Sequence, residues 1–90
     1  MQIGTIYKAD GTTEVIRPVH GGQLSLAQLQ RAVGGHIELV QMAAGNGHAK
    51  MFINEDGKRL GLPYNAQASA LLHPNYCDRV VGNAIVIVHE

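Results

Sequence analysis

Residues 80–88 read VVGNAIVIV, and the last four of them, Ile85, Val86, Ile87 and Val88, are apolar without interruption. Successive side chains of a strand point to opposite faces of the sheet, so an unbroken apolar run predicts a strand buried on both faces. The β-branched residues in this run also favour the strand conformation. We therefore expect residues 80–88 to form an interior strand around which the rest of the sheet is built.

Other segments of the chain are predicted to complete this sheet. Asp10-Gly11 is a turn sequence typical of hairpins, because glycine adopts positive φ without strain. Pro18 has no N–H to donate to a neighbouring strand, so the strand that contains it belongs at an edge of the sheet. We expect four more strands, at residues 2–8, 13–19, 36–43 and 49–54.

A first helix is predicted after residue 24. Ser25 and Gln28 have the spacing of a capping box, in which each side chain accepts a hydrogen bond from the backbone N–H of the other residue. Gly34-Gly35 is expected to end the helix, with one glycine left-handed. Three apolar residues then share one helical face, namely Leu26, Leu29 and Val33.

A second, shorter helix is predicted over residues 66–72. Asn65 precedes it and is a preferred N-cap residue. His73-Pro74 is expected to end it, because the residue before proline disfavours helical geometry.

These elements predict an α+β fold, with a small mixed or antiparallel sheet of about five strands and two short helices on one face. The 90 residues are expected to form a single domain, residues 1–90. Two short helices leave the opposite face of the sheet without a cover, and a second copy of the chain would supply one. We therefore expect a homo-oligomer, either a dimer or a larger assembly.

The composition excludes several classes of partner. Seven Lys and Arg residues balance seven Asp and Glu residues, whereas nucleic-acid-binding proteins carry a basic surplus. No apolar run approaches the length of a membrane span. One cysteine, Cys77, predicts a reducing compartment and hence a cytoplasmic protein. The five histidines lack metal-ligand spacing, and neither a metal nor a cofactor is expected.

The best candidate for a functional site is the start of the second helix, because free N–H groups and the helix dipole attract anions there. Nearby cations would neutralise a phosphate, and Tyr64 would stack on a base. The candidate ligand-binding residues are Asn54, Lys58, Arg59, Tyr64, Asn65, Ala66, Gln67 and Arg79.

Each of these segments also has a structural interpretation. Asp56-Gly57 is a strong turn signal by itself, and its charged neighbours are then simply solvated. Asn65 in turn is explained by helix capping alone, with Tyr64 packed beside it. No catalytic residues are assigned, since a hydrolase built from Glu55, Asp56 and a distant histidine has little support.

Four motifs occur in a fixed order along most of the chain: VGGHIE at 33–38, NEDGK at 54–58, LPYNAQA at 62–68 and VGNA at 81–84. Their order and spacing over residues 24–88 resemble a family of small phage and mobile-element proteins catalogued as a domain of unknown function. The resemblance implies a phage or mobile-element origin and an intracellular setting, and it implies no catalytic residues. Small phage proteins of this kind often counteract host defences, some by holding a nucleotide signal.

Two functions compete on this evidence. The first is a non-enzymatic accessory protein that binds and sequesters a small anionic ligand, with a nucleotide immune signal as one candidate. The alternative is a protein-binding inhibitor or adaptor that acts on a host protein through an apolar sheet face or a strand edge. The two-faced apolar strands and the low charge fit either function.

Overall fold

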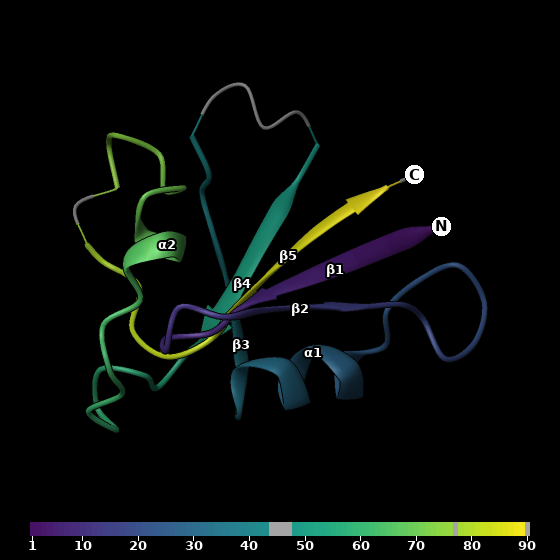
Figure 1. The fold of residues 1–90 in the computed structure, drawn as a ribbon, viewed down its shortest axis with the longest axis horizontal. Helices are drawn as coiled ribbons and strands as arrows, with labels where there is room; N and C mark the ends of the chain where they lie inside the picture. The colour runs from purple at the N-terminus through teal and green to yellow at the C-terminus, as the bar shows by residue number, and fades with distance from the viewer. Residues whose placement is uncertain (44–47, 77, 90) are drawn as a thin grey trace.

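The computed structural model describes residues 1–43, 48–76 and 78–89, and within these ranges it shows an α+β fold (Figure 1). A five-stranded antiparallel sheet has the order β2-β1-β5-β4-β3. The predicted fold class is therefore confirmed. The elements are β1 (Gln2–Tyr7), β2 (Thr13–Ile16), α1 (Leu26–Val33), β3 (Ile37–Val40), β4 (Lys50–Asn54), α2 (Ala66–Ser69) and β5 (Ala84–His89).

The central position of β5 confirms the prediction made from its apolar run. It pairs with β1 over six residues, from Gln2↔His89 to Tyr7↔Ala84, and with β4 on its other side. Ile85 is completely buried, and both faces of β5 contribute to the core. The pairing of Gln2 with His89 also brings the two ends of the described chain together, as Figure 1 shows.

The hairpin of β1 and β2 forms at the predicted turn. The N–H of Gly11 donates to the carbonyl of Lys8 at 3.0 Å, and the N–H of Lys8 donates to the carbonyl of Thr12 at 2.9 Å. Gly11 has a φ of 93°, which explains the choice of glycine at this position. β2 ends at Ile16, two residues before Pro18, and lies at an edge of the sheet as predicted.

α1 has the capping box that its sequence predicts. The Ser25 hydroxyl accepts from the N–H of Gln28, and the Gln28 side chain accepts from the N–H of Ser25, both at 3.1 Å. Gly34 ends the helix in the left-handed conformation, with a φ of 81°. The predicted apolar face is corrected in one respect: Leu29 and Val33 are buried, whereas Leu26 is 58% exposed and its place in the core is taken by Ala32.

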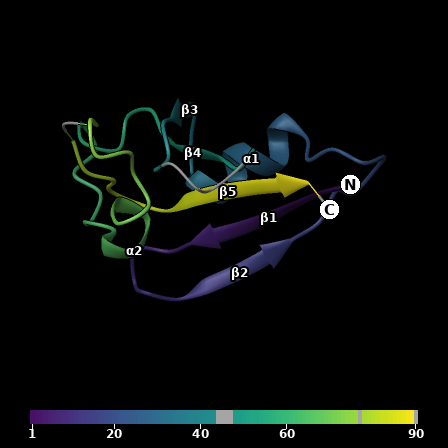
Figure 2. The ribbon, with the colours of Figure 1, turned by 90° about the horizontal axis from the view of Figure 1, so that it is seen from above.

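The two helices lie on opposite faces of the sheet, so the prediction that both cover one face is wrong. Ile85 and Ile87 pack in the cluster that contains Leu29 of α1. Ala84 and Val86, which point the other way, pack in the cluster that contains Ala68 of α2. Figure 2 shows the helices well apart, with β5 passing between them. The first four residues of β5 are buried on both faces because each helix covers a different one, whereas Val88 and His89 are exposed.

Several elements are shorter than the sequence predicted. α2 ends at Ser69 rather than Leu72, and the chain then continues through turns. β3 covers only four of the eight predicted residues, and β5 begins at Ala84 because Gly82, with a φ of 76°, interrupts the strand direction. The predicted loop at residues 44–47 and the single cysteine, Cys77, lie outside the described ranges.

One part of the sheet has little cover on the side that carries α2. The cross-strand pairs Ile3↔Val88 and Thr5↔Val15 lie on this side, away from α2. Val15 is 54% exposed, and Val88 is also exposed. We call Thr5, Val15 and Val88 the open patch. A whole uncovered face, as predicted, is therefore not observed, because each face carries one helix and the open patch is only part of one face.

Candidate functional site

Three of the predicted ligand-binding residues meet at one cavity. Asn54 at the end of β4, Lys58 in the following turn and Arg79 before β5 line a cleft of about 190 Å³. We call this cavity the turn cleft. Its lining residues come from distant parts of the sequence, so tertiary folding brings this part of the predicted set together.

Tyr64 lies beside this cleft and contacts Arg79. The guanidinium carbon of Arg79 lies 5.7 Å from the centre of the Tyr64 ring, within the range of a cation–π interaction. An isolated bridge between Tyr64 and Val81 places the two segments side by side. The tyrosine is exposed and does not itself line the cleft, so its predicted stacking on a ligand stays a prediction.

Cations near the turn cleft already form ion pairs with carboxylates of the protein. Lys58 forms an ion pair with Asp78, and Arg59 lies 3.4 Å from the Asp56 carboxylate. Glu38 and Glu55 also line the cleft. With three carboxylates and two cations among its lining residues, the cleft has a net charge of −1, which disfavours an anion.

Asn54 and Asn65, both predicted to contact a ligand, have structural hydrogen bonds instead. The Asn54 amide donates to the carbonyl of Val33 at 3.2 Å and accepts from the N–H of Asp56 at 2.8 Å. Asn65, only 1% exposed, accepts from the N–H of Ala68 at 3.0 Å, which confirms its capping role. Its side chain also donates to two backbone carbonyls, so little of its hydrogen-bonding capacity remains.

The remaining predicted residues do not converge on the turn cleft. Ala66 and Gln67 are exposed residues of α2, and neither they nor Arg59 line the cavity. The four residues of α2 give only a small helix dipole, and the N–H of Ala68 is already bonded to Asn65. The expected anion site at the start of α2 therefore lacks both a cationic recess and most of its dipole.

A larger cavity lies between α1 and the β1–β2 hairpin, with a volume of about 660 Å³. We call it the hairpin groove. Its size falls within the usual range for small-molecule sites, and its lining combines apolar residues with a few polar groups, as such sites do. The lining residues are Ile6, Lys8, Glu14, Ile16, Val19, His20, Ser25, Ala27, Gln28, Arg31, Ala32 and Asn83.

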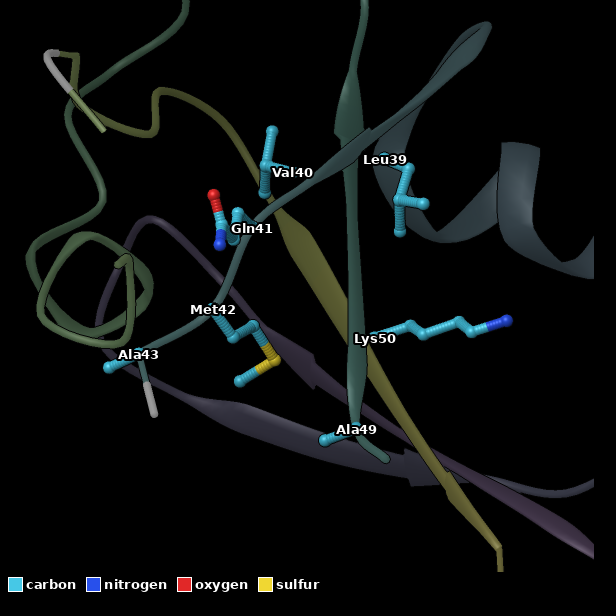
Figure 3. Close-up of a pocket in the computed structure, with 7 residues that line it drawn as sticks. All are labelled: Leu39, Val40, Gln41, Met42, Ala43, Ala49 and Lys50. Atoms are coloured by element: carbon cyan, nitrogen blue, oxygen red, sulfur yellow. The ribbon is translucent and has the colours of Figure 1, made fainter. Parts of the chain in front are cut away.

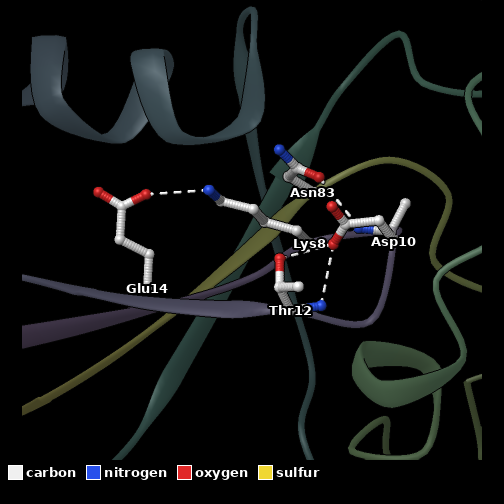
Figure 4. A network of polar contacts seen from close by, with 6 residues as sticks. Lys8, Asp10, Thr12, Glu14 and Asn83 are labelled. Atoms are coloured by element: carbon white, nitrogen blue, oxygen red, sulfur yellow. Dashed lines mark hydrogen bonds and ion pairs between the residues drawn. The ribbon is translucent and has the colours of Figure 1, made fainter.

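The hairpin groove carries a different charge from the turn cleft. The Lys8 ammonium lies 3.1 Å from the Glu14 carboxylate, on the side of the hairpin that faces α1 (Figure 4). Arg31, in the last turn of α1, has no ion-pair partner among the described residues. Two cations and one carboxylate leave the groove with a net charge of +1 when His20 is neutral.

Two long-range hydrogen bonds connect the segments around this groove. The Gln28 side chain of α1 donates to the carbonyl of Arg17 at 2.9 Å, which ties the helix to the segment after β2. The N–H of Ala9 donates to the Asn83 side chain at 3.0 Å, which holds the hairpin turn against the segment before β5 (Figure 4). The first bond connects the two walls directly, and the second holds the far end of the hairpin in place.

Sequence reasoning missed the hairpin groove because its walls are distant in sequence. Lys8 and Glu14 lie on either side of the Asp10-Gly11 turn, and Arg31 lies on α1 away from Leu29. Locally, the sequence indicated only that these charged residues belong to two predicted elements, the hairpin around Asp10-Gly11 and the first helix. That α1, packed on β4 and β5, would face the hairpin across a groove was not encoded in any motif.

A third cavity, of about 430 Å³, lies between the end of β3 and the start of β4 (Figure 3). Leu39 and Lys50 point away from the ribbon at one side, and Met42 points toward Ala49 at the other. Its walls adjoin residues 44–47, outside the described ranges, so we assign no site to it.

Among the residues that the structure describes, two ionisable groups have shifted pKa values. Hydrogen bonds from the Thr12 hydroxyl and backbone lower the pKa of the Asp10 carboxyl below its ordinary value. Burial, with a smaller contribution from Glu38, raises the pKa of the Tyr76 hydroxyl in the turn cleft. Neither group lines the hairpin groove, so neither shift belongs to that site.

The described residues form neither a cluster of metal-ligating side chains nor a membrane-spanning helix. In residues 1–43, 48–76 and 78–89, no three His, Cys, Asp or Glu side chains group together in a way that suits a metal ion. In the same ranges no helix is long and apolar enough to cross a membrane.

The fold and its cavities define a small α+β domain with a ligand-sized groove between a helix and a hairpin. The model of the domain of unknown function DUF3846 matches residues 4–90, so the chain belongs to this family. The predicted resemblance to a family of unknown function is thus confirmed. No curated protein and no solved structure matches the sequence.

Proposed function

We propose that the protein binds a small anionic ligand in the hairpin groove and holds it without chemical change. The observation that carries this proposal is the position of Arg31, a cation without an ion-pair partner in the described chain, on the wall of the hairpin groove. A guanidinium binds carboxylate and phosphate groups through paired hydrogen bonds. Lys8 lines the same groove, where its charge is paired with Glu14, so Arg31 carries the net positive charge.

The hairpin groove suits an anion better than the turn cleft predicted from sequence. An anion near Lys58 would have to compete with Asp78 and would meet the charges of Glu38 and Glu55. In the hairpin groove the one lining carboxylate, Glu14, is already paired with Lys8. The same pairing makes Glu14 a weak candidate for a general base, which favours holding a ligand over reacting with it.

The biological role that we propose follows the sequence resemblance. An accessory protein of a phage or mobile element would lower the free concentration of a host signal by binding it, and a nucleotide immune signal is one such ligand. Sequestration of this kind requires a protein in excess over the signal but no turnover.

A melting-temperature screen tests the proposal. A ligand at a hundredfold excess over its Kd stabilises the native state by about 2.7 kcal/mol. For a domain of this size that corresponds to a rise in Tm of roughly 10–20 °C. The panel contains nucleotides, cyclic nucleotides, phosphorylated sugars and carboxylic acids. Release of the chemically unchanged ligand when the protein is denatured supports sequestration. New products detected by chromatography would instead show that the protein is an enzyme.

Two double variants locate the site. Lys8→Ala with Arg31→Ala is expected to abolish the shift, since it removes both cations of the hairpin groove. Lys58→Ala with Arg59→Ala is the matched control, and it is expected to leave the shift unchanged. The opposite pattern would place the ligand at the turn cleft, and no shift across the panel would overturn the proposal.

The open patch favours protein binding as a second candidate function. Val15 and Val88 are exposed apolar side chains on a sheet surface that no helix covers, and such surfaces often mediate association. A homo-oligomer built on the same patch remains our expectation. Val15→Lys with Val88→Lys should reduce the apparent mass in analytical ultracentrifugation, or abolish capture of one stoichiometric host protein. If neither measurement changes, the patch is not an interface.

A further inference from the structure

We propose that the ligand of the hairpin groove is an aliphatic carboxylate, a monoanion with an apolar chain. This inference rests on the proposed function, since it specifies the ligand of the same groove. It combines three properties of the lining residues, namely their aliphatic composition, their net charge and the hydrogen-bond donors that remain free.

The apolar part of the groove is aliphatic. Ile6, Ile16 and Val19 line it from the hairpin, and Ala27 and Ala32 line it from α1. Ile6 and Ala32 also belong to the core cluster beneath, so the floor of the groove continues into the hydrophobic core. Such a surface packs well against methylene groups, which gain stability in proportion to the apolar area they bury.

The lining lacks the aromatic platform that nucleotide sites commonly use. His20 is the one ring among the described lining residues, and no Tyr or Phe joins it. The described aromatic contact of Arg79 with Tyr64 lies at the other cavity, outside this groove. A nucleobase would therefore lose most of the stacking energy that selects it in other proteins.

The net charge of the groove matches one negative charge on the ligand. Lys8 and Glu14 compensate each other at 3.1 Å, which leaves Arg31 as the uncompensated cation. A carboxylate contributes one negative charge and accepts two parallel hydrogen bonds from a guanidinium. Phosphate monoesters and polyphosphates carry more charge, and the excess would face Glu14.

The two uncharged polar side chains that α1 and its N-cap contribute to the groove lining, Ser25 and Gln28, are engaged in hydrogen bonds. The Ser25 hydroxyl caps the helix, and the Gln28 side chain bonds to the backbone at Ser25 and at Arg17. The Arg31 guanidinium, also on α1 and in the groove lining, makes no hydrogen bond or ion pair with the described residues. The head group is thus expected at Arg31, with the chain directed toward Ile6 and Ile16.

Isothermal titration with acids of increasing length tests this inference. The probes are acetate, butanoate, hexanoate and octanoate, with hexylamine, hexanol and AMP as comparisons. Each methylene buried in the groove is expected to lower Kd about fourfold. Hexylamine and AMP are expected not to bind, because the first has the wrong charge and the second has no stacking partner.

Paired variants separate the two parts of the proposed site. Arg31→Gln is expected to raise the Kd for octanoate at least tenfold. Its control is Arg59→Gln, because Arg59 is an exposed arginine outside the groove. Val19→Ser is expected to flatten the dependence of Kd on chain length, since Val19 is 70% exposed and tolerates the change. Leu60→Ser is its control, because Leu60 is an exposed apolar residue outside both the groove lining and the open patch.

The outcomes distinguish this inference from the proposed function. Binding of AMP or another nucleotide that depends on Arg31, without binding of the acids, overturns the inference and leaves the function standing. Acids that bind with no dependence on chain length, or with no response to Arg31→Gln and Val19→Ser, also overturn it. A groove that binds neither acids nor any other anion of the larger panel contradicts both proposals.

Discussion

The side-chain amide of Asn65 donates a hydrogen bond of 2.8 Å to the backbone carbonyl of Tyr7, 58 positions earlier in the chain. It donates a second one of 2.9 Å to the carbonyl of Gly82 and accepts a third from Ala68. A single buried side chain thus connects β1, the start of α2 and the segment before β5. We attribute the position of α2 on its face of the sheet largely to this residue.

The first prediction concerns Asn65. Asn65→Ala leaves two carbonyls and one N–H without their partner, and each unsatisfied buried group costs about 1–3 kcal/mol. Because these costs are not additive, we expect the free energy of unfolding to fall by about 3 kcal/mol, measured by urea denaturation. Gln67→Ala, at an exposed site on the same helix, should change it by less than about 0.5 kcal/mol. Equal stability of the two variants would contradict the role assigned to Asn65.

The second prediction concerns the close approach at Gly4 in β1. A Cβ atom there would lie 2.8 Å from Cδ1 of Ile85 and 2.9 Å from Cδ1 of Leu24. Both neighbours are buried, so Gly4→Ala should lower the free energy of unfolding by about 1–3 kcal/mol through overpacking. Gly22→Ala is the control, since its nearest atom would be 3.9 Å away. A Gly4→Ala variant as stable as the control would show that the core has room to adjust.

The third prediction distinguishes two leucines of α1. Leu29 is 7% exposed and packs in the core, so Leu29→Ala should cost about 2–5 kcal/mol. Leu26 is exposed, and Leu26→Ala should change the free energy of unfolding by less than about 0.5 kcal/mol. Thermal unfolding by circular dichroism measures both. A large cost at Leu26 would indicate that this side chain is buried in solution, for example between two copies of the chain.

The fourth prediction is a pH effect in the β1–β2 turn. The Thr12 hydroxyl donates to the Asp10 carboxylate at 2.6 Å, so Thr12→Val should raise the Asp10 pKa toward its ordinary value. A lowered folded-state pKa stabilises the protein above the unfolded pKa, and this contribution is lost as pH falls through the folded pKa. The stability difference between wild type and Thr12→Val should therefore shrink in acid. NMR titration of the Asp10 carboxyl carbon gives the pKa directly, and an unchanged value would contradict the assignment.

The local elements were largely predictable from the sequence. The uninterrupted apolar run of β5 specifies a strand buried on both faces, and Asp10-Gly11 specifies a hairpin turn. Ser25, Gln28 and Gly34 define both ends of α1. In each case the signal lies within a few residues, because capping, turn geometry and side-chain alternation are short-range effects.

The candidate site was only partly predictable. The sequence identified Lys58 and Arg79 as possible partners of an anion, and folding does bring them to one cavity. It gave no indication that Asp78 would form an ion pair with Lys58. Nor did it indicate that the side-chain amide of Asn65 would donate to two backbone carbonyls. Those outcomes depend on contacts between segments that are distant in the chain.

By itself, then, the sequence determined the identity of the strands, the hairpin, the capped helix and the family to which the chain belongs. Only the tertiary structure decided that the helices take opposite faces of the sheet, and that Arg31 and Lys8 share a groove. The reason is that secondary structure follows from neighbours in sequence, whereas packing follows from which apolar faces can be buried together. Net charge at a cavity depends on packing in the same way, because it sums side chains that only the fold brings within a few ångströms of one another.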